Sequence, residues 1–184
     1  MAASLIGLPE IANHQAFNQA RWAELCADPA LASLDYRIET DRFGHILMSP
    51  PPSFEHSDRQ GRILEKLAHL LGARGRARPE VPVSTTGGVK AIDAAWISDE
   101  RLRRAYKGQV LTVAPEICIE VLSPSNTLEE IEETKRLYFE AGAEEVWICA
   151  LGGRMLFYCR DTLEPAIHLQ LCPEFPATLE SDPR

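Results

Sequence analysis

Two acidic residues lie in otherwise apolar segments of the chain. Asp93 belongs to the run Ala-Ile-Asp-Ala-Ala-Trp-Ile, and Glu120 belongs to the run Ile-Cys-Ile-Glu-Val-Leu. Runs of this length and composition are typical of buried β-strands. An ionised carboxylate in such a strand is costly unless it is paired or binds a cation. Carboxylate oxygens are the ligands that Mg²⁺ and Mn²⁺ prefer, so Asp93 and Glu120 predict a divalent-metal site suited to phosphodiester hydrolysis.

Such chemistry also needs a positive charge near the phosphate. Lys135, on the helix predicted after the Glu120 strand, is the nearest candidate in sequence. Lys90 is another, but it lies three residues from Asp93, and strand alternation places it on the opposite face. A simpler interpretation of Lys135 also stands, because it follows an acidic run whose charges suit a solvated helix face with short-range ion pairs.

Three arginines, Arg74, Arg76 and Arg78, and one of the 5 histidines, His56, are candidate substrate contacts. The arginines would neutralise a phosphate backbone if they flanked a cleft, although a solvated surface is the favoured interpretation of the run taken alone. His56 follows a proline-rich turn at the start of a predicted helix, where it would reach a substrate or cap the helix. The net charge of −8 argues against nonspecific coating of nucleic acid.

The composition predicts one soluble globular domain over residues 1–184, because 45% of the residues are hydrophobic and 25% are charged. We find no apolar run of the roughly 18–20 residues that a membrane span needs, and no secretory signal pattern, so we expect a cytoplasmic protein. The 5 cysteines match no zinc or redox spacing and are expected to be reduced and mostly buried.

The periodicity predicts a mixed α/β fold with helices on the faces of a sheet, an N-terminal helix and a β-hairpin. The strands that contain Glu120 and Trp147 flank a helix and should therefore be parallel. The residues after Pro173 show little periodicity and are expected to fray. Predicted helices cover residues 10–27, 53–72, 99–106 and 126–141. Predicted strands cover residues 35–40, 44–49, 76–84, 89–97, 116–122, 146–149, 154–159 and 167–171, which places the core at about 35–172.

Several of these pieces, taken in order, resemble the Uma-type putative restriction endonuclease family of the PD-(D/E)xK nuclease superfamily. The resemblance runs from about Tyr36 to Tyr158 and is most specific in the run Glu-Val-Leu-Ser-Pro-Ser at 120–125, followed by a tyrosine and Ala-Gly. It implies a restriction-endonuclease-like fold and a magnesium-type site. Asp93 and Glu120 would be metal ligands, Glu39 a further acidic residue of the site, and a helix lysine the charge stabiliser.

One departure from the family pattern concerns that lysine. The family usually has it four residues before the tyrosine, where this chain has Thr134, and Lys135 lies three residues before Tyr138. Two hypotheses follow. The chain is either a Mg²⁺-dependent endonuclease that hydrolyses DNA, or a weakened or inactive nuclease-fold protein that binds nucleic acid or protein. A homodimer is compatible with either hypothesis.

Overall fold

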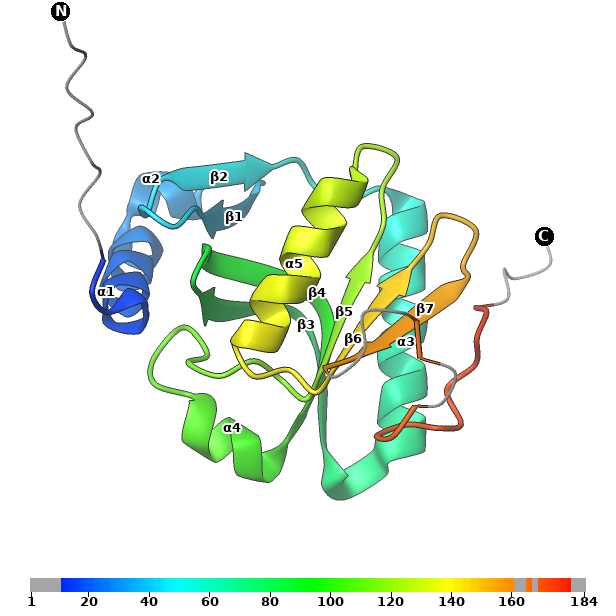
Figure 1. The fold of residues 1–184 in the computed structure, drawn as a ribbon. Helices are drawn as coiled ribbons and strands as arrows, with labels where there is room; N and C mark the ends of the chain where they lie inside the picture. The colour runs from blue at the N-terminus through cyan, green and yellow to red at the C-terminus, as the bar shows by residue number, and fades with distance from the viewer. Residues whose placement is uncertain (1–10, 161–164, 167–168, 180–184) are drawn as a thin grey trace, which may run out of the picture.

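The centre of the protein is a five-stranded mixed sheet, seen in a computed structural model that describes residues 11–160, 165–166 and 169–179 (Figure 1). Its strands follow chain order across the sheet, and the pairs are antiparallel except for β5 with β6, which is parallel as predicted. The strands are β3 (Gly75–Thr85), β4 (Gly88–Ser98), β5 (Ile117–Val121), β6 (Glu145–Cys149) and β7 (Met155–Cys159).

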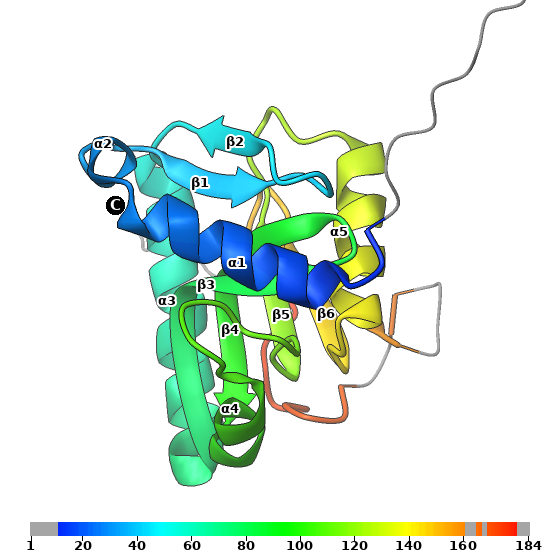
Figure 2. The ribbon, with the colours of Figure 1, turned by 90° about the vertical axis from the view of Figure 1, so that its left-hand side faces the viewer.

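Helices cover both faces of this sheet, with α3 and α5 on opposite sides (Figure 2). Two side chains fix where these helices begin. Ser53 caps α3, and Thr127 caps α5 in a capping box with Glu130. The helices are α1 (His14–Ala27), α2 (Pro29–Ala32), α3 (Phe54–Leu71), α4 (Asp99–Ala105) and α5 (Leu128–Glu140), with a 3-10 turn η1 (Gly72–Arg74) after α3.

The two faces of the sheet bury separate hydrophobic clusters. Ile63 and Leu67 of α3 pack with Trp147 on one face. On the other face, Tyr138 of α5 packs with Ile148 and Ile92. The two clusters hold the central strands rigidly between the helices, and the acidic residues of β4 and β5 are carried by those strands.

A β-hairpin of β1 (Arg37–Thr40) and β2 (Ile46–Ser49) forms a second, two-stranded sheet beside the first. Its β1 strand lies against β4, where Thr40 Oγ1 accepts a hydrogen bond of 2.8 Å from Val89 N. This close approach requires glycine at residue 88. Gly88 has φ +106°, and a Cβ there would lie 2.3 Å from the carbonyl oxygen of Thr40.

The C-terminal part of the chain differs from the sequence prediction. Residues 169–171 form no strand, and residues 167–168 of the predicted strand lie outside the described part of the chain. The amides of Gln170 and Leu171 instead donate hydrogen bonds to the buried Glu145 carboxylate. Phe175 and Leu179 are buried, so the prediction that the chain frays after residue 173 is wrong through Leu179.

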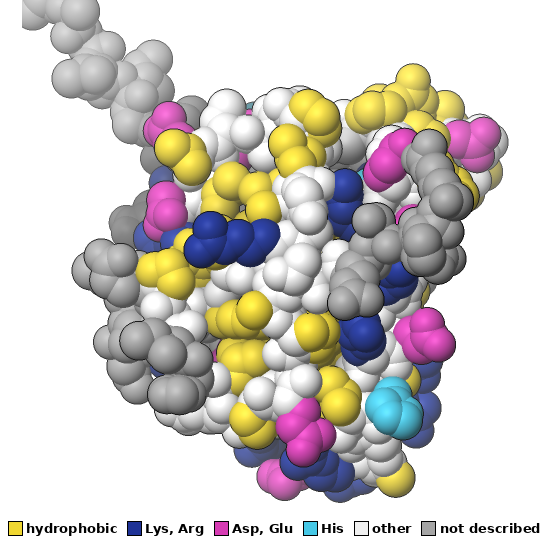
Figure 3. Space-filling model, turned by 90° about the vertical axis from the view of Figure 1, so that its right-hand side faces the viewer, with side chains coloured by type: hydrophobic (Ala, Val, Ile, Leu, Met, Phe, Trp, Pro, Cys, Tyr) yellow, Lys and Arg dark blue, Asp and Glu magenta, His cyan; other side chains and the backbone are white. Residues whose placement is uncertain are grey.

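Hydrophobic, basic and acidic side chains are intermixed on the face of the molecule that lies to the right in Figure 1 (Figure 3). Among the described helices, none is long and apolar enough to cross a membrane.

Candidate active site

A cleft of about 1210 Å³ lies where β1, the first turn of α3 and the ends of β4 and β5 meet. Its walls include the proline-rich turn at residues 50–52 and the loop at residues 123–126 that follows β5. Arg37, His56, Asp93 and Glu120 all line it. The cleft therefore collects the polar groups of segments that are far apart in the sequence.

Asp93 and Glu120 face each other across two antiparallel strands. The last paired residues of β4 and β5 at this end are Ala94 and Ile119, so the next positions along the ladder are Asp93 and Glu120. The ladder stops there because the Asp93 side chain takes the place of a backbone acceptor: its Oδ2 accepts a hydrogen bond of 2.7 Å from Val121 N. The register thus brings the two carboxyl groups to the same end of neighbouring strands, where the charge of Asp93 acts on Glu120.

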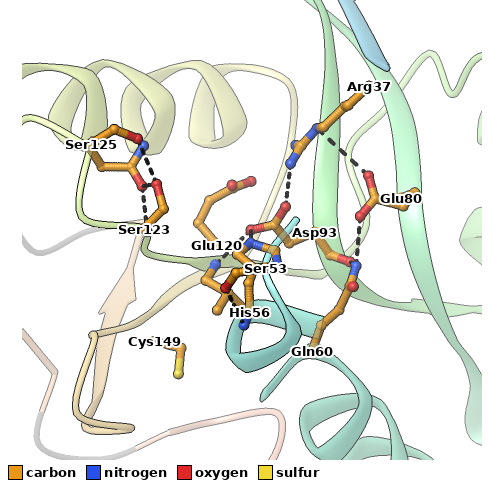
Figure 4. Close-up of polar contacts among 12 residues, drawn as sticks. Arg37, Ser53, His56, Gln60, Glu80, Asp93, Glu120, Ser123, Ser125 and Cys149 are labelled. Atoms are coloured by element: carbon orange, nitrogen blue, oxygen red, sulfur yellow. Dashed lines mark hydrogen bonds and ion pairs between the residues drawn. The ribbon is translucent and has the colours of Figure 1, made fainter. Parts of the chain in front are cut away.

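Asp93 is almost completely buried and is held by groups from three further segments (Figure 4). Arg37 Nη1 forms an ion pair with Oδ1, and His56 Nε2 lies 3.2 Å from Oδ2. Burial opposes ionisation, but the hydrogen bond to His56, the Arg37 charge and the Val121 amide together lower the pKa of Asp93 below its usual value. Asp93 is consequently a carboxylate rather than a carboxylic acid.

Glu120 lies in a different electrostatic environment. Burial and the charge of Asp93 raise its pKa well above the usual value, although Arg37 and a hydrogen bond from Tyr138 oppose that shift. The Tyr138 hydroxyl donates to Glu120 Oε1 at 2.5 Å and so fixes the orientation of the carboxyl group. The positive charge near these two carboxyl groups is therefore smaller than the charge that ionisation of both would require.

Glu39 contributes a third acidic group near this pair. Its Oε1 accepts a hydrogen bond of 2.9 Å from the amide of Ala91 and lies 3.3 Å from Arg37 Nη2. Lys90 Nζ lies 3.5 Å from the other oxygen, Oε2. Glu39 thus connects β1 to β4 at the edge of the cleft.

Glu80 of β3 lies opposite Asp93, between the paired residues Pro79 and Val81. Among the described residues, Glu80 is the only residue other than glycine with a positive φ, which is 47°. Its Oε1 accepts a hydrogen bond of 2.7 Å from Gln60 Nε2, a group that also donates to the Asp93 carbonyl. Left-handed backbone at a non-glycine residue is strained, and it is found most often at functional sites.

His56 lies in the first turn of α3, and its ring points at Asp93 (Figure 4). The hydrogen bond to Asp93 raises the pKa of His56, against an opposing effect of burial. Its Nδ1 has no hydrogen-bond partner within the described part of the chain. The structure thus brings His56 into the cleft, where the sequence left open whether it merely caps the helix.

Lys135 does not join this group of residues. Its ammonium lies 3.7 Å from the centroid of the Tyr158 ring and 2.7 Å from Glu132 Oε1, and the side chain is almost fully buried there. Residues four apart share a helix face, so the position aligned with Tyr138, and hence with Glu120, is Thr134. The structure therefore places Lys135 outside the cleft lining, against the prediction that it reaches the site.

The three arginines proposed as backbone contacts lie outside the lining of the cleft. Arg74 Nε donates to the Leu71 carbonyl at 3.3 Å, and Arg76 Nε forms an ion pair with Asp99 at 3.1 Å. Arg74 ends η1, and Arg76 and Arg78 lie at the start of β3, whereas the acidic residues lie further along the sheet. Their pattern reflects a charged edge strand and not a lining of this cleft.

Comparisons with known proteins bear on the family and the fold. The model of the Uma2 family, described as "Putative restriction endonuclease", matches residues 22–183. The chain belongs to the Uma2 family. No curated protein matches it. Among solved structures, a putative nuclease of the DUF820 family from Anabaena variabilis is similar, with 18% identity and a TM-score of 0.58 over 68% of this chain and 73% of that one.

This similarity shows that the Uma2 chain has the nuclease-like fold expected from its sequence: an N-terminal helix, a hairpin, and a five-stranded mixed sheet between helices. At this level of identity the likeness concerns the fold alone. The chemistry of the site therefore depends on the residues of the cleft.

The donor set of the cleft suits magnesium. Within the described residues, no three histidine, cysteine or acidic side chains converge as a preformed metal cage. Magnesium does not require such a cage, because it is usually held by one or two carboxylates and completes its shell with water and substrate oxygens. Asp93 and Glu120 could supply the two carboxylates, and burial together with the charge of Asp93 raises the pKa of Glu120.

Sequence reasoning missed three residues of the site: Arg37, Gln60 and Glu80. Arg37 stands two residues before Glu39, so strand alternation would have placed both on one face of the hairpin. No comparable signal marks Gln60 or Glu80, because their roles depend on how α3 packs across β3 and β4.

Proposed function

We propose that this Uma2 protein is a metal-dependent endonuclease that hydrolyses the phosphodiester bonds of DNA. The observation that supports this best is the pair Asp93 and Glu120, which stand opposite each other on adjacent strands inside a cleft. A cleft that carries paired carboxylates, a histidine and an arginine is suited to hydrolysis of a charged diester.

Asp93 and Glu120 would hold the metal, with Glu39 completing the acidic surroundings. A bound Mg²⁺ or Mn²⁺ would polarise the phosphate and lower the pKa of a bound water. The protein's own part is to keep the two carboxylates aligned. The Val121 amide and His56 orient Asp93, and the Tyr138 hydroxyl orients Glu120.

The experiment is incubation of purified protein with supercoiled plasmid in Mg²⁺ or Mn²⁺. We expect nicking that stops in EDTA and in Asp93→Asn, which keeps the size of the side chain but removes its charge. Parallel single-stranded DNA and RNA substrates would establish the substrate class. Nicking that continues in Asp93→Asn would contradict the assignment of this cleft.

A second candidate function follows from the position of Lys135. Because its ammonium is engaged by Glu132 and Tyr158, α5 provides no lysine to the cleft. The chain would then be a nuclease-fold protein that binds nucleic acid without cutting it. Binding of labelled DNA without cleavage in any divalent metal would favour this function.

A further inference from the structure

We propose that Arg37 supplies the fixed positive charge of this site and contacts the scissile phosphate. The inference rests on the proposed endonuclease function and names the residue that neutralises the substrate. Hydrolysis of a phosphodiester develops negative charge on the phosphate oxygens, so a cation placed beside the carboxylates lowers the barrier.

The helix that follows β5 does not provide this cation. Tyr138 reaches Glu120, and the residue one turn earlier on the same face is the uncharged Thr134. Lys135 is rotated by about 100° from that face and packs against β7. Lys90 lies outside the cleft lining and interacts with Glu39 at 3.5 Å.

Arg37 lies among the acidic groups of the cleft. It forms an ion pair with Asp93, lies 3.3 Å from Glu39 and 3.7 Å from Glu80, and interacts with the charge of Glu120. These carboxylates come from β1, β3, β4 and β5, so the guanidinium is located where four strands bring negative charge together (Figure 4). A side chain held this way is positioned before any substrate arrives.

The guanidinium still has donors to offer. Arginine carries five N–H groups in a planar fork that matches phosphate oxygens. Nη1 faces Asp93 and Nη2 faces Glu39, and each of these terminal nitrogens carries a second N–H group. The Nε is buried and lies 3.7 Å from Glu80 Oε2, so the terminal nitrogens are the ones that can meet a phosphate. The side chain also lines the open cleft, so a phosphate can reach it.

The test compares plasmid cleavage by wild type, Arg37→Met, Arg37→Lys and the double variant Arg37→Met/Thr134→Lys. We expect Arg37→Met to lower kcat by about 100-fold or more, as loss of one charge-stabilising donor does in other hydrolases. A lysine at residue 134 would project from the Glu120-facing side of α5. The kcat of the double variant should therefore be at least about tenfold higher than that of Arg37→Met. Arg37→Lys keeps the charge but loses the fork, and it should be intermediate.

Two binding measurements separate this role from a structural one. Titration calorimetry with Mn²⁺ should show that Arg37→Met binds the metal at least as tightly as wild type, because a competing cation has been removed. Fluorescence anisotropy with a short labelled DNA duplex in Ca²⁺ should show weaker binding by Arg37→Met. Lys135→Met is the matched control and should equal wild type in all three assays.

A wild-type rate in Arg37→Met, or a double variant no faster than Arg37→Met, would overturn the proposal. If Arg37→Met does not fold, Arg37→Lys decides, and a wild-type kcat in that variant would overturn it. A wild-type protein that binds the duplex but never cleaves it contradicts the endonuclease function alone. In that case unchanged duplex binding by Arg37→Met would overturn the role of Arg37, and weakened binding would support its phosphate contact.

Discussion

Asp93 and Glu120 are the same kind of group in the same cleft, yet their surroundings favour opposite protonation states. Asp93 has Arg37, His56 and the Val121 amide, and its pKa is lowered. Glu120 is buried beside the charge of Asp93, and its pKa is raised although Arg37 and the Tyr138 hydroxyl oppose that shift. Unequal support of two paired carboxyl groups is common where acid–base or metal chemistry takes place.

Tyr138 should influence metal binding through Glu120. Tyr138→Phe removes the hydroxyl that donates to Glu120 Oε1, so the carboxyl group loses its orientation. We expect Mn²⁺ affinity to fall by about 10-fold in titration calorimetry at pH 7, the usual cost of losing a group that orients a ligand. The exposed Tyr106 provides the control, and equal affinity in Tyr138→Phe and Tyr106→Phe would contradict this role.

The cysteines should differ strongly in reactivity. Burial raises the pKa of Cys149 to about 11, so about one thiol in a thousand is ionised at pH 8. Cys26 is exposed, whereas Cys118, Cys149 and Cys172 are buried. We expect a thiol reagent at pH 8 to modify Cys26 first, and the rate at Cys149 to rise with pH toward 11. Equal labelling rates of Cys149 and Cys26 in mass spectrometry would contradict the burial of Cys149 in β6.

At the scale of elements, the strands that carry the carboxylates could be predicted from the sequence, and their surroundings could not. Apolar runs locate β4 and β5, and the register of these strands brings Asp93 and Glu120 to the same end of the sheet once the strands are known to pair. The direction of Lys135 escaped prediction because a shift of one residue on a helix rotates the side chain by about 100°. Arg37 escaped because the docking of the hairpin against β4 depends on contacts between distant residues.

Gly88 tests whether that docking builds the site. In Gly88→Ala a Cβ would collide with the Thr40 carbonyl at 2.3 Å, in addition to the strain of φ +106°. We expect a loss of about 1–3 kcal/mol in urea unfolding, together with slower cleavage, because Arg37 and Glu39 would move with β1.

Gly61→Ala is the matched control for that substitution. Gly61 lies within α3, and a Cβ there has no atom within 4 Å. It should stabilise the protein by about 0.5–1 kcal/mol, because alanine favours helix more than glycine does. Equal unfolding midpoints for both glycine variants would show that β1 does not depend on the close approach at Gly88.

At the scale of the whole molecule, the C-terminal segment closes the hydrophobic face that α3 leaves open. Phe175 lies 4.7 Å from Trp147, measured between ring centroids, and packs edge-on to Phe157. The sequence did not predict this packing because residues 169–179 have no regular period. Their order comes from contacts with β6 and β7, including the two hydrogen bonds to Glu145.

Phe175→Ala should therefore destabilise the fold without touching the cleft. We expect a loss of about 3–5 kcal/mol in urea unfolding, the usual cost of removing a buried aromatic ring. Phe54 is 81% exposed, and Phe54→Ala should change stability by less than about 0.5 kcal/mol. Similar losses in the two variants would contradict the packing of the C-terminal segment.

The rate of plasmid nicking in Mg²⁺ by wild type, Glu120→Gln and Lys135→Met tests the central claim most directly. If Asp93 and Glu120 form one metal-dependent centre, wild type and Lys135→Met will nick the plasmid at the same rate and Glu120→Gln will not nick it. Nicking by Glu120→Gln at the wild-type rate would contradict the account, as would a wild-type protein that cleaves in no divalent metal.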